Sequence, residues 1–369
     1  MKQFIFLFFI ISLCSLSLSA QEEKTYFSSL DEALQNPDKV VSLELRNNAY
    51  TEVPKDILEC KNLLYLDISN NEIKELPRWL FRLKYLTVLN VSNNHITEIP
   101  RQIKKCEFLE TINCSENNIS SLPESIGALS KLKNLYVLQN NVRDLPASFA
   151  NLNNLRIVNL QSNQFTSFPD AIVHNDRITS LVLSENNIQH LPQSLINLTL
   201  LEELYISDCG LDSVPEFLHN FRRLEVLDMS HNAILSLPRE FSSISSLHIV
   251  YLHNNKLLQL PQNFGNLQNV RELRLDHNSL DDLPQSLSQM ESLFKLYINN
   301  NNFDAIPAFF SSISSLRYIY IDYNMLLRSE NVLRELSQLH MIGVYAETDV
   351  SKKSIQRFQE SIPKIVVIY

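Results

Sequence analysis

The sequence predicts an α/β fold built as a solenoid, with short parallel strands on the concave side and short helical or 3₁₀ segments on the convex side. Two observations support this prediction. One motif recurs every 23 residues, and apolar and polar residues alternate inside each copy of it. The composition agrees, because a chain of 369 residues that is 44% hydrophobic and has 19 Phe can form a continuous core.

The motif has the form L-x-x-L-x-L-x-x-N-x-L-x-x-L-P, and residues 63–77 and 86–100 are consecutive copies of it. Its asparagine returns at the same step along the chain without an insertion or deletion, with a cysteine at position 209. The asparagines are Asn48, Asn71, Asn94, Asn117, Asn140, Asn163, Asn186, Asn232, Asn255, Asn278, Asn301 and Asn324. Such a regular series predicts thirteen strands stacked in one register.

Each motif position has a physical role. Leu66 and Ile68 point to one face of a strand, because side chains alternate, while their neighbours point to the other face. The asparagine amide turns inward and pairs backbone groups that the bend would otherwise leave unpaired. Proline then ends the turn. Three residues after it comes another core side chain: Leu80, Ile103, Ile126, Phe149, Ile172, Leu195, Leu218, Phe241, Phe264, Leu287 and Phe310.

This pattern resembles the leucine-rich-repeat family in its 23-residue form, over roughly residues 40–345. The resemblance implies a leucine-rich-repeat solenoid (horseshoe), with protein binding as its role. Cysteine-rich caps, which extracellular animal members usually carry, are missing from the sequence. The chain therefore resembles exported bacterial members, such as those of spirochaetes and Bacteroidetes.

The chain divides into four parts by pattern. We expect a signal peptide at 1–20, an N-terminal cap with a helix at 21–39, about thirteen repeats at 40–328, and a C-terminal cap with a degenerate last repeat at 329–369. Within the C-terminal cap the sequence predicts a helix, a strand, a second helix and a closing strand, at 329–339, 339–344, 351–361 and 365–369.

The first twenty residues read as a secretory signal. Lys2 precedes the apolar run Phe4–Leu13, and small residues lead to Ala20. We expect an exported protein that is secreted, periplasmic or attached to the cell surface, and no later segment is apolar enough to span a membrane. Two alternatives stay open: an uncleaved anchor, and a lipoprotein modified at Cys14.

Charge and glycine content exclude several functions. The chain has 41 acidic and 32 basic residues and a net charge of −9, without a basic cluster, so nucleic acid is not an expected partner. Four glycines, far apart, cannot form a phosphate-binding loop. Motifs such as H-E-x-x-H and G-x-S-x-G are missing. We therefore expect no cofactor and no enzymatic activity.

Cysteines and histidines occupy repeat positions. Cys60, Cys106, Cys114 and Cys209 lie where other repeats have core residues or the asparagine, so we expect buried packing residues. His231 and His277 share one column two repeats apart, with His253 nearby. These three are expected to be solvated surface residues and not metal ligands, because they cannot converge on one ion; a three-histidine metal site is the alternative.

The solvent-facing column of the strands changes character along the chain. Its first half is small and polar, and its second half alternates tyrosine with charge. Exposed tyrosine among charges is typical of recognition surfaces, although tyrosine also simply suits an exposed strand. The predicted partner-binding residues are Tyr205, Asp208, Asp228, Tyr251, Glu272, Arg274, Asp276, Tyr297, Tyr318 and Tyr320.

These observations favour a monomeric, non-catalytic exported protein that binds a protein or peptide partner through its concave face, in adhesion or host interaction. The tyrosines would anchor a partner with some basic character, and Asp208, Asp228, Glu272 and Asp276 would supply the complementary charge. The alternative is an envelope scaffold that self-associates through its edges or convex side. Fold alone does not decide between them.

Overall fold

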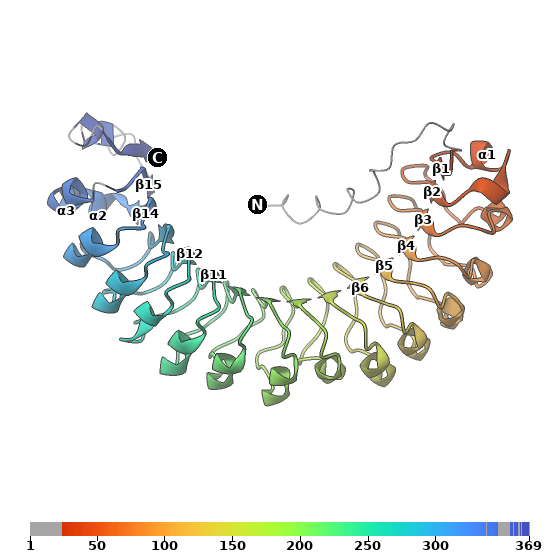
Figure 1. Cartoon of the computed structure of the whole chain (residues 1–369), viewed down its shortest axis with the longest axis horizontal. Helices are drawn as coiled ribbons and strands as arrows, with labels where there is room; N and C mark the ends of the chain where they lie inside the picture. Colours follow the sequence, from red (N-terminus) through yellow and green to blue (C-terminus); the bar gives the residue numbers. More distant parts are fainter. Residues whose placement is uncertain are drawn as a thin grey trace, which may run out of the picture.

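The chain forms a curved solenoid with one continuous sheet along its concave side (Figure 1). It is a computed structural model that describes residues 24–336, 338–345, 355–356, 358–360, 362 and 364–368. The predicted signal peptide and Cys14 lie outside the described residues, as does most of the helix predicted at 351–361.

The sheet has sixteen parallel strands that follow one another in chain order, where the sequence predicted thirteen in the repeats. The strands are β1 (Tyr26–Phe27), β2 (Ser42–Glu44), β3 (Tyr65–Asp67), β4 (Val88–Asn90), β5 (Thr111–Asn113), β6 (Asn134–Tyr136), β7 (Ile157–Asn159), β8 (Ser180–Val182), β9 (Glu203–Tyr205), β10 (Val226–Asp228), β11 (Ile249–Tyr251), β12 (Glu272–Arg274), β13 (Lys295–Tyr297), β14 (Tyr318–Asp322), β15 (Met341–Tyr345) and β16 (Val366–Ile368).

Short 3₁₀ turns form the convex side, as predicted. They are η1 (Pro37–Lys39), η2 (Lys55–Glu59), η3 (Leu80–Arg82), η4 (Arg101–Lys105), η5 (Glu124–Ala128), η6 (Ala147–Asn151), η7 (Asp170–His174), η8 (Gln193–Asn197), η9 (Glu216–Asn220), η10 (Arg239–Ser243), η11 (Phe264–Asn266), η12 (Gln285–Gln289) and η13 (Ala308–Ser312). Among the described residues, α-helices at the ends include α1 (Leu30–Ala33), α2 (Tyr323–Arg328) and α3 (Glu330–Glu335), and residues 355–356 and 358–360 are also helical.

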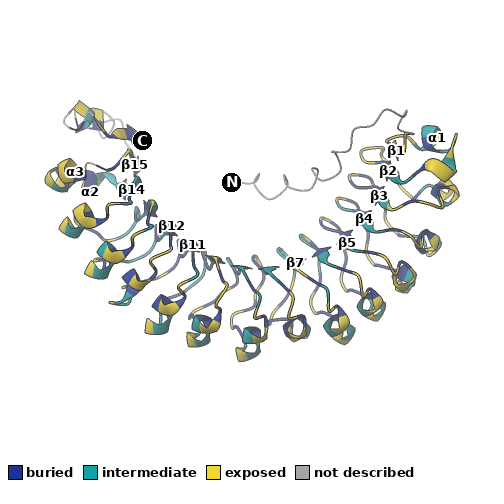
Figure 2. Cartoon of the chain, in the orientation of Figure 1, coloured by how far each residue is buried: buried dark blue, intermediate teal, exposed yellow. Residues whose placement is uncertain are grey.

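The core runs between the sheet and the convex turns (Figure 2). Each three-residue strand buries its middle residue, and the predicted core residue of every convex turn is also buried. Parallel pairing keeps repeats in register, so that Leu227 lies beside Leu204 and Val250. One continuous apolar column results, because each coil buries its own apolar side chains only against its neighbours.

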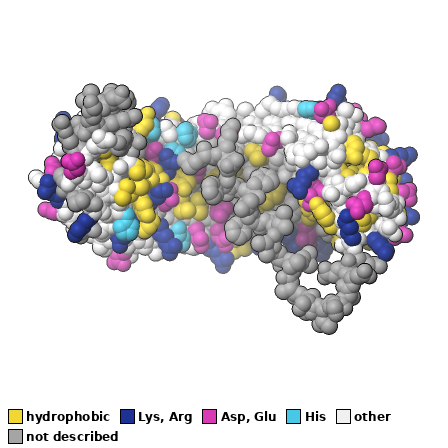
Figure 3. Space-filling view, turned by 90° about the horizontal axis from the view of Figure 1, so that it is seen from above, with side chains coloured by type: hydrophobic (Ala, Val, Ile, Leu, Met, Phe, Trp, Pro, Cys, Tyr) yellow, Lys and Arg dark blue, Asp and Glu magenta, His cyan; other side chains and the backbone are white. Residues whose placement is uncertain are grey.

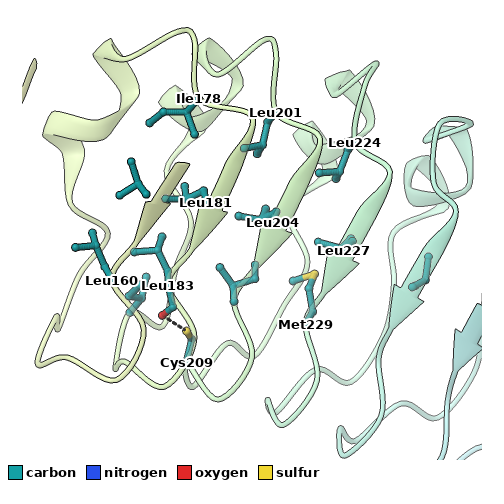
Figure 4. Close-up of a cluster of buried hydrophobic side chains, with 14 of the residues drawn as sticks. Leu160, Ile178, Leu181, Leu183, Leu201, Leu204, Cys209, Leu224, Leu227 and Met229 are labelled. Carbon is teal, nitrogen blue, oxygen red and sulfur yellow. Dashed lines mark hydrogen bonds between the residues drawn. The ribbon is translucent and has the colours of Figure 1, made fainter. Parts of the chain in front are cut away.

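The described cysteines are packing residues, as predicted. Cys60, Cys106, Cys114 and Cys209 are free thiols buried in the core. The Cys209 thiol lies among leucines and donates to the Leu183 carbonyl oxygen at 3.3 Å (Figure 4). Burial raises the pKa of Cys209 to about 12, which keeps it protonated and unreactive near neutral pH.

The asparagines tie adjacent coils together. The Asn140 amide nitrogen donates to the carbonyl oxygens of Cys114, Val137 and Leu138 at 3.0, 3.1 and 3.2 Å, and its amide oxygen accepts from Ile119 N at 3.0 Å. We call the residues that repeat this set the asparagine ladder: Asn71, Asn94, Asn117, Asn140, Asn163, Asn186, Asn232, Asn255, Asn278 and Asn301.

Two predicted members do not belong to the ladder. Asn48 is exposed, and its side-chain Nδ2 donates to the carbonyl oxygen of Arg46 in its own coil and not to the neighbouring coil. Asn324 is exposed on α2, because the chain turns into a helix where earlier repeats bend inward. Tyr323, which the sequence placed beside the concave column, also belongs to α2 and packs partly buried against the core.

The residue before each motif asparagine from Asn48 to Asn301, and before Cys209, adopts a left-handed backbone conformation. Its φ lies between 50° and 61° from Asn47 to Asn300. Asn, Asp and His adopt this conformation more readily than other non-glycine residues, and they supply eight of the twelve positions. Sequence reasoning missed this role, which Asp208, His231 and His277 all have.

Both ends are covered in ways that differ from the prediction in detail. At the N-terminus, β1 adds an unexpected strand beside β2, and α1 begins after Ser29, whose hydroxyl accepts from Glu32 N at 3.5 Å. At the C-terminus, the helix predicted at 329–339 is shorter, since α3 ends at Glu335. The hydroxyl of Ser329, just before α3, accepts from Ile306 N at 2.7 Å.

We predict that Asn140→Ala lowers the free energy of unfolding by about 2–3 kcal/mol, because three carbonyls and one N–H lose their buried partner. Urea denaturation followed by circular dichroism measures this loss. The control is Asn48→Ala, which removes an exposed amide and should cost less than about 0.5 kcal/mol. Equal losses in the two variants would contradict the ladder as the main tie between coils.

Candidate functional site

The predicted partner-binding residues lie on the concave side of β9–β14 and form rows across the strands. Parallel register places Tyr205, Asp228, Tyr251, Arg274, Tyr297 and Tyr320 side by side, followed by Gly343 of β15. We call these residues the central row. Two residues earlier in each strand lies the second row: Glu203, Val226, Ile249, Glu272, Lys295, Tyr318 and Met341.

Arg274 is held in place by Asp276. Its Nε and Nη2 donate to the Asp276 Oδ1 and Oδ2 at 3.1 and 3.0 Å, and His277 Nδ1 lies 3.1 Å from Oδ2. Asp276 is only 2% exposed. Burial raises its pKa, but the hydrogen bonds and charge of Arg274 outweigh that effect, and the pKa ends below its usual value. Asp276 therefore positions Arg274. The sequence analysis expected Asp276 to offer its charge to a partner, but that charge is already paired with Arg274.

The tyrosines of β13 and β14 stack on one another. The Tyr297 and Tyr320 ring centroids are 4.2 Å apart with an interplanar angle of 11°. The Arg274 guanidinium carbon lies 4.8 Å from the Tyr297 centroid. Gly343 leaves room for the Tyr320 ring, since a Cβ there would lie 2.2 Å from Tyr320 Cδ1. Arg274, Tyr297, Tyr320 and Gly343 thus form one stack along the central row.

The second row adds a further pair of charges. Lys295 Nζ lies 3.7 Å from Glu272 Oε1, and it also lies 4.9 Å from the Tyr297 ring centroid and 5.8 Å from that of Tyr320. The Tyr251 hydroxyl donates to Glu272 Oε1 at 3.5 Å. The charge of Glu272 is therefore matched within the face itself.

The acids on β9 and β10 have a different environment. Asp228 accepts from Ser230 N and Oγ at 2.9 and 2.6 Å, and burial raises its pKa. Asp208 is exposed at the left-handed position after β9. Burial raises the pKa of Tyr205, which lies between β8 and β10. These acids are not paired with Lys or Arg in the described part of the chain.

An aromatic group missed from the sequence lies beside the second row. Phe294 is 46% exposed, and its ring centroid is 5.1 Å from that of Tyr318, which also meets the His340 ring at 6.2 Å. Phe294 and His340 each directly precede a strand. We call the residues at this position the flank row: Glu202, Glu225, His248, Arg271, Phe294, Arg317 and His340. In Figure 3 hydrophobic side chains gather at this C-terminal end of the concave side.

His253 is buried, which corrects the expectation of a solvated ring. It is 9% exposed, and its ring meets those of His231 and Tyr251 edge-on at 5.2 and 6.0 Å. Its Nδ1 finds no hydrogen-bond partner among the described residues. Burial, helped by the nearby charge of Arg274, lowers the pKa of His253 to about 4.

The other two histidines of the proposed metal alternative are exposed and bonded elsewhere. His231 Nε2 lies 3.3 Å from Asn254 Nδ2, and His277 Nε2 lies 2.9 Å from Asn300 Nδ2. Across the described ranges, no group of three or more His, Cys, Asp or Glu side chains could hold a metal ion. The geometry offers rigid aromatic and charged side chains for contact.

Comparisons with known proteins agree on the architecture. A family model described as a leucine-rich repeat region matches residues 78–172 and 218–368, and a leucine rich repeat model matches residues 38–96 and 153–211. No curated protein matches the sequence. Within the described residues, no helix has the length and apolar character needed to span a bilayer.

Three solved structures illustrate the likeness. A leucine-rich repeat protein of Leptospira interrogans is 22% identical with a TM-score of 0.81, over 94% of this chain and 100% of that chain. An internalin of Listeria monocytogenes is 19% identical with a TM-score of 0.65, over 79% and 92%. The ectodomain of an Arabidopsis thaliana receptor kinase, in complex with Casparian strip integrity factor 2, is 23% identical with a TM-score of 0.68, over 89% and 41%.

We predict that Gly343→Ala destabilises the chain by about 1–3 kcal/mol, because the new methyl group forces the Tyr320 ring out of its stack. Urea denaturation gives the loss, and near-ultraviolet circular dichroism reports the tyrosine environment. In a Tyr320→Ala background the same change should cost almost nothing. A full loss in that background would show that the stack is not what Gly343 protects.

We predict that stability falls between pH 6.5 and pH 4 in part through His253. Its pKa of about 4 lies below the ordinary value of 6.5, so acid protonates the unfolded chain first and favours unfolding. By pH 4 the titration of His253 should remove about 3 kcal/mol of stability, and this stability should be fully present well above pH 6.5. His253→Gln should flatten this part of the stability curve, measured by urea denaturation at each pH. An unchanged curve would contradict the prediction. The matched control is His95→Gln, at an exposed histidine in a distant coil, which should leave the curve as it is.

Proposed function

Because the chain belongs to the leucine-rich repeat family, whose members are typically non-catalytic, we propose that it is a non-catalytic protein that binds a protein or peptide partner on its concave surface. The single observation that supports this most is the stack of Arg274, Tyr297 and Tyr320. Its side chains point away from the core, yet contacts with one another and with Asp276 fix their positions.

Rigid aromatic and arginine side chains suit binding because they lose little conformational entropy when a partner contacts them. The C-terminal concave face offers such side chains together with the exposed Phe294. The Arabidopsis ectodomain, of which this chain covers only 41%, was solved with a bound factor. That relative supports ligand binding as a use of the fold, and the identity of any partner of this chain stays a proposal.

The proposal includes export. Residues 1–20 carry the pattern of a secretory signal, so we place the protein outside the cytoplasm, as a secreted, periplasmic or surface-attached monomer. Adhesion or host interaction is the role that fits such a location.

The test is affinity capture. We predict that the chain enriches a partner from envelope or host-matrix extract, and that Tyr251→Ala with Tyr297→Ala reduces this enrichment at least about tenfold, because it removes two side chains from the centre of the face. Quantitative mass spectrometry measures the enrichment. The matched control is Tyr65→Ala with Tyr136→Ala, two tyrosines of the same sheet on β3 and β6.

Capture that both double variants leave unchanged would reject the concave face and favour the scaffold alternative. One observation supports that alternative. Leu235 and Leu258 lie in adjacent coils and are 52% and 57% exposed, and Leu258 N donates to Leu235 O at 3.2 Å. An apolar pair of this kind on the edge of the solenoid would suit self-association.

A further inference from the structure

The charges of the concave face are separated along the solenoid. On β9 and β10 the three rows carry four acids, and Asp208 after β9 adds a fifth. The five are Glu202, Glu203, Asp208, Glu225 and Asp228, and these parts of the rows contain no Lys or Arg. Arg222 and Arg223 lie further out, in the turn before β10, and are not ion-paired with these acids in the described structure. The Nδ1 atom of His248 lies 3.8 Å from Glu225 Oε2. This part of the face is negative at neutral pH.

On β12–β15 the balance has the opposite sign. The acids Glu272 and Asp276 are matched by Lys295 and Arg274 within the face. Asp322 accepts from Asn300 N with both carboxylate oxygens, at 2.9 and 2.8 Å, and keeps its charge. Arg271 and Arg317 remain in the flank row. Arg317 donates only to carbonyl oxygens, those of Ser314 and Leu316, and neither arginine has an ion pair among the described residues. Four Lys and Arg residues therefore exceed three acids by one on this part of the face.

The basic end of the face is also the aromatic end. Phe294 lies in the flank row between Arg271 and Arg317, next to Tyr318. The central row adds the Tyr297–Tyr320 stack, and Met341 follows in the second row. An acidic partner residue could therefore meet an arginine while its apolar neighbour packs on the rings. The acidic end of the face offers only one aromatic side chain, Tyr205, and one aliphatic side chain in the second row, Val226.

We propose that the partner is an extended protein segment lying across the strands, with basic side chains over β9–β10 and acidic and apolar side chains over β12–β15. This inference rests on the proposed function and specifies the ligand. It also revises the expectation of a basic partner, because only half of the face is acidic. Strands about 4.8 Å apart separate the centres of the two regions by about 15–20 Å, which an extended segment of five or six residues covers.

Charge separation of this kind sets orientation. A segment bound the wrong way round would place like charges together, which costs several kcal/mol across an interface. Salt screens such contacts on a length of about 10 Å at 0.1 M ionic strength. Binding should therefore weaken with salt even though the most buried contacts are aromatic.

The test begins with a random twelve-residue peptide library displayed on phage and selected on the purified full chain. We expect enriched peptides to carry Lys or Arg in one half and Asp or Glu with Phe, Tyr or Leu in the other half, always in the same order. Synthetic copies are then titrated by fluorescence anisotropy at low and high salt.

Reversing charges on the chain shows where each half of the peptide binds. Arg271→Glu with Arg317→Glu should weaken the selected peptides at least about tenfold, and Glu202→Lys with Glu225→Lys should do the same. The matched controls change the same charge on the convex side: Lys104→Glu with Lys105→Glu on η4, and Glu59→Lys with Glu216→Lys on η2 and η9. These controls should stay within about twofold. A peptide whose acidic half is made basic should regain binding to the arginine-reversed chain, which a folding defect could not produce.

Three results would overturn the inference. Peptides that need Tyr251 and Tyr297 but show no charge order would reject the two-ended segment and leave the proposed function standing. Peptides with the charge order that tolerate both reversals would reject the placement of the two halves. If selection enriches no peptide, a short extended segment is rejected as the ligand. The proposed function itself is rejected only if Tyr251→Ala with Tyr297→Ala leaves capture from extract unchanged.

Discussion

The asparagine ladder is the constraint on which the rest of the structure depends. In every coil from Asn71 to Asn301 except that of Cys209, one side-chain amide bonds to backbone groups of its own turn and of the preceding coil, and this repeats the geometry of the turn after the strand. Because every coil bends at the same place, every strand begins at the same place. The in-register rows of the concave face follow directly from this repetition.

The ladder is interrupted at coil eight, where Cys209 replaces asparagine. The thiol donates to Leu183 O and Ser207 O but cannot accept from Ile188 N as an amide oxygen would. The backbone adjusts nearby: Gln189 takes a φ of 61°, His190 N bonds to Ile188 O at 2.7 Å, and Gly210 has a φ of 76°. Glycine is suited to this position because it adopts positive φ at little cost. The concave face changes from small polar residues to tyrosine and charge at this same coil.

The sequence predicts most of this fold because each repeat position has one dominant physical role. Leu66 and Ile68 can only face the core, and Phe149 or Phe241 can only fill a convex turn, so periodicity is enough to place them. The ends escape prediction because their residues lose the period. β1 has only two residues, which is too short to show a period. Asn324 keeps the ladder spacing but lies on α2, because spacing alone does not show where the chain leaves the solenoid.

The site is less predictable, because the sequence shows which residues face solvent and not which of them contact one another. Asp276 and Glu272 look alike in the sequence. In the structure Asp276 is buried beside Arg274, whereas Glu272 is partly exposed beside Lys295. Phe294 and Arg317 precede their strands and so fall outside the alternation that marks the face.

Pairing within the face decides which charges a partner can use. Where a carboxylate already neutralises a cation in a partly buried contact, a partner must break that contact to exploit the charge, and breaking it leaves a buried ion unpaired. Arg274 and Lys295 are therefore fixed parts of an aromatic platform, whereas Arg271, Arg317, Glu202 and Glu225 stay available at its edge. The repeat places these edge residues in one row, and in the binding mode that we propose the order of their charges along that row sets the direction of the bound segment.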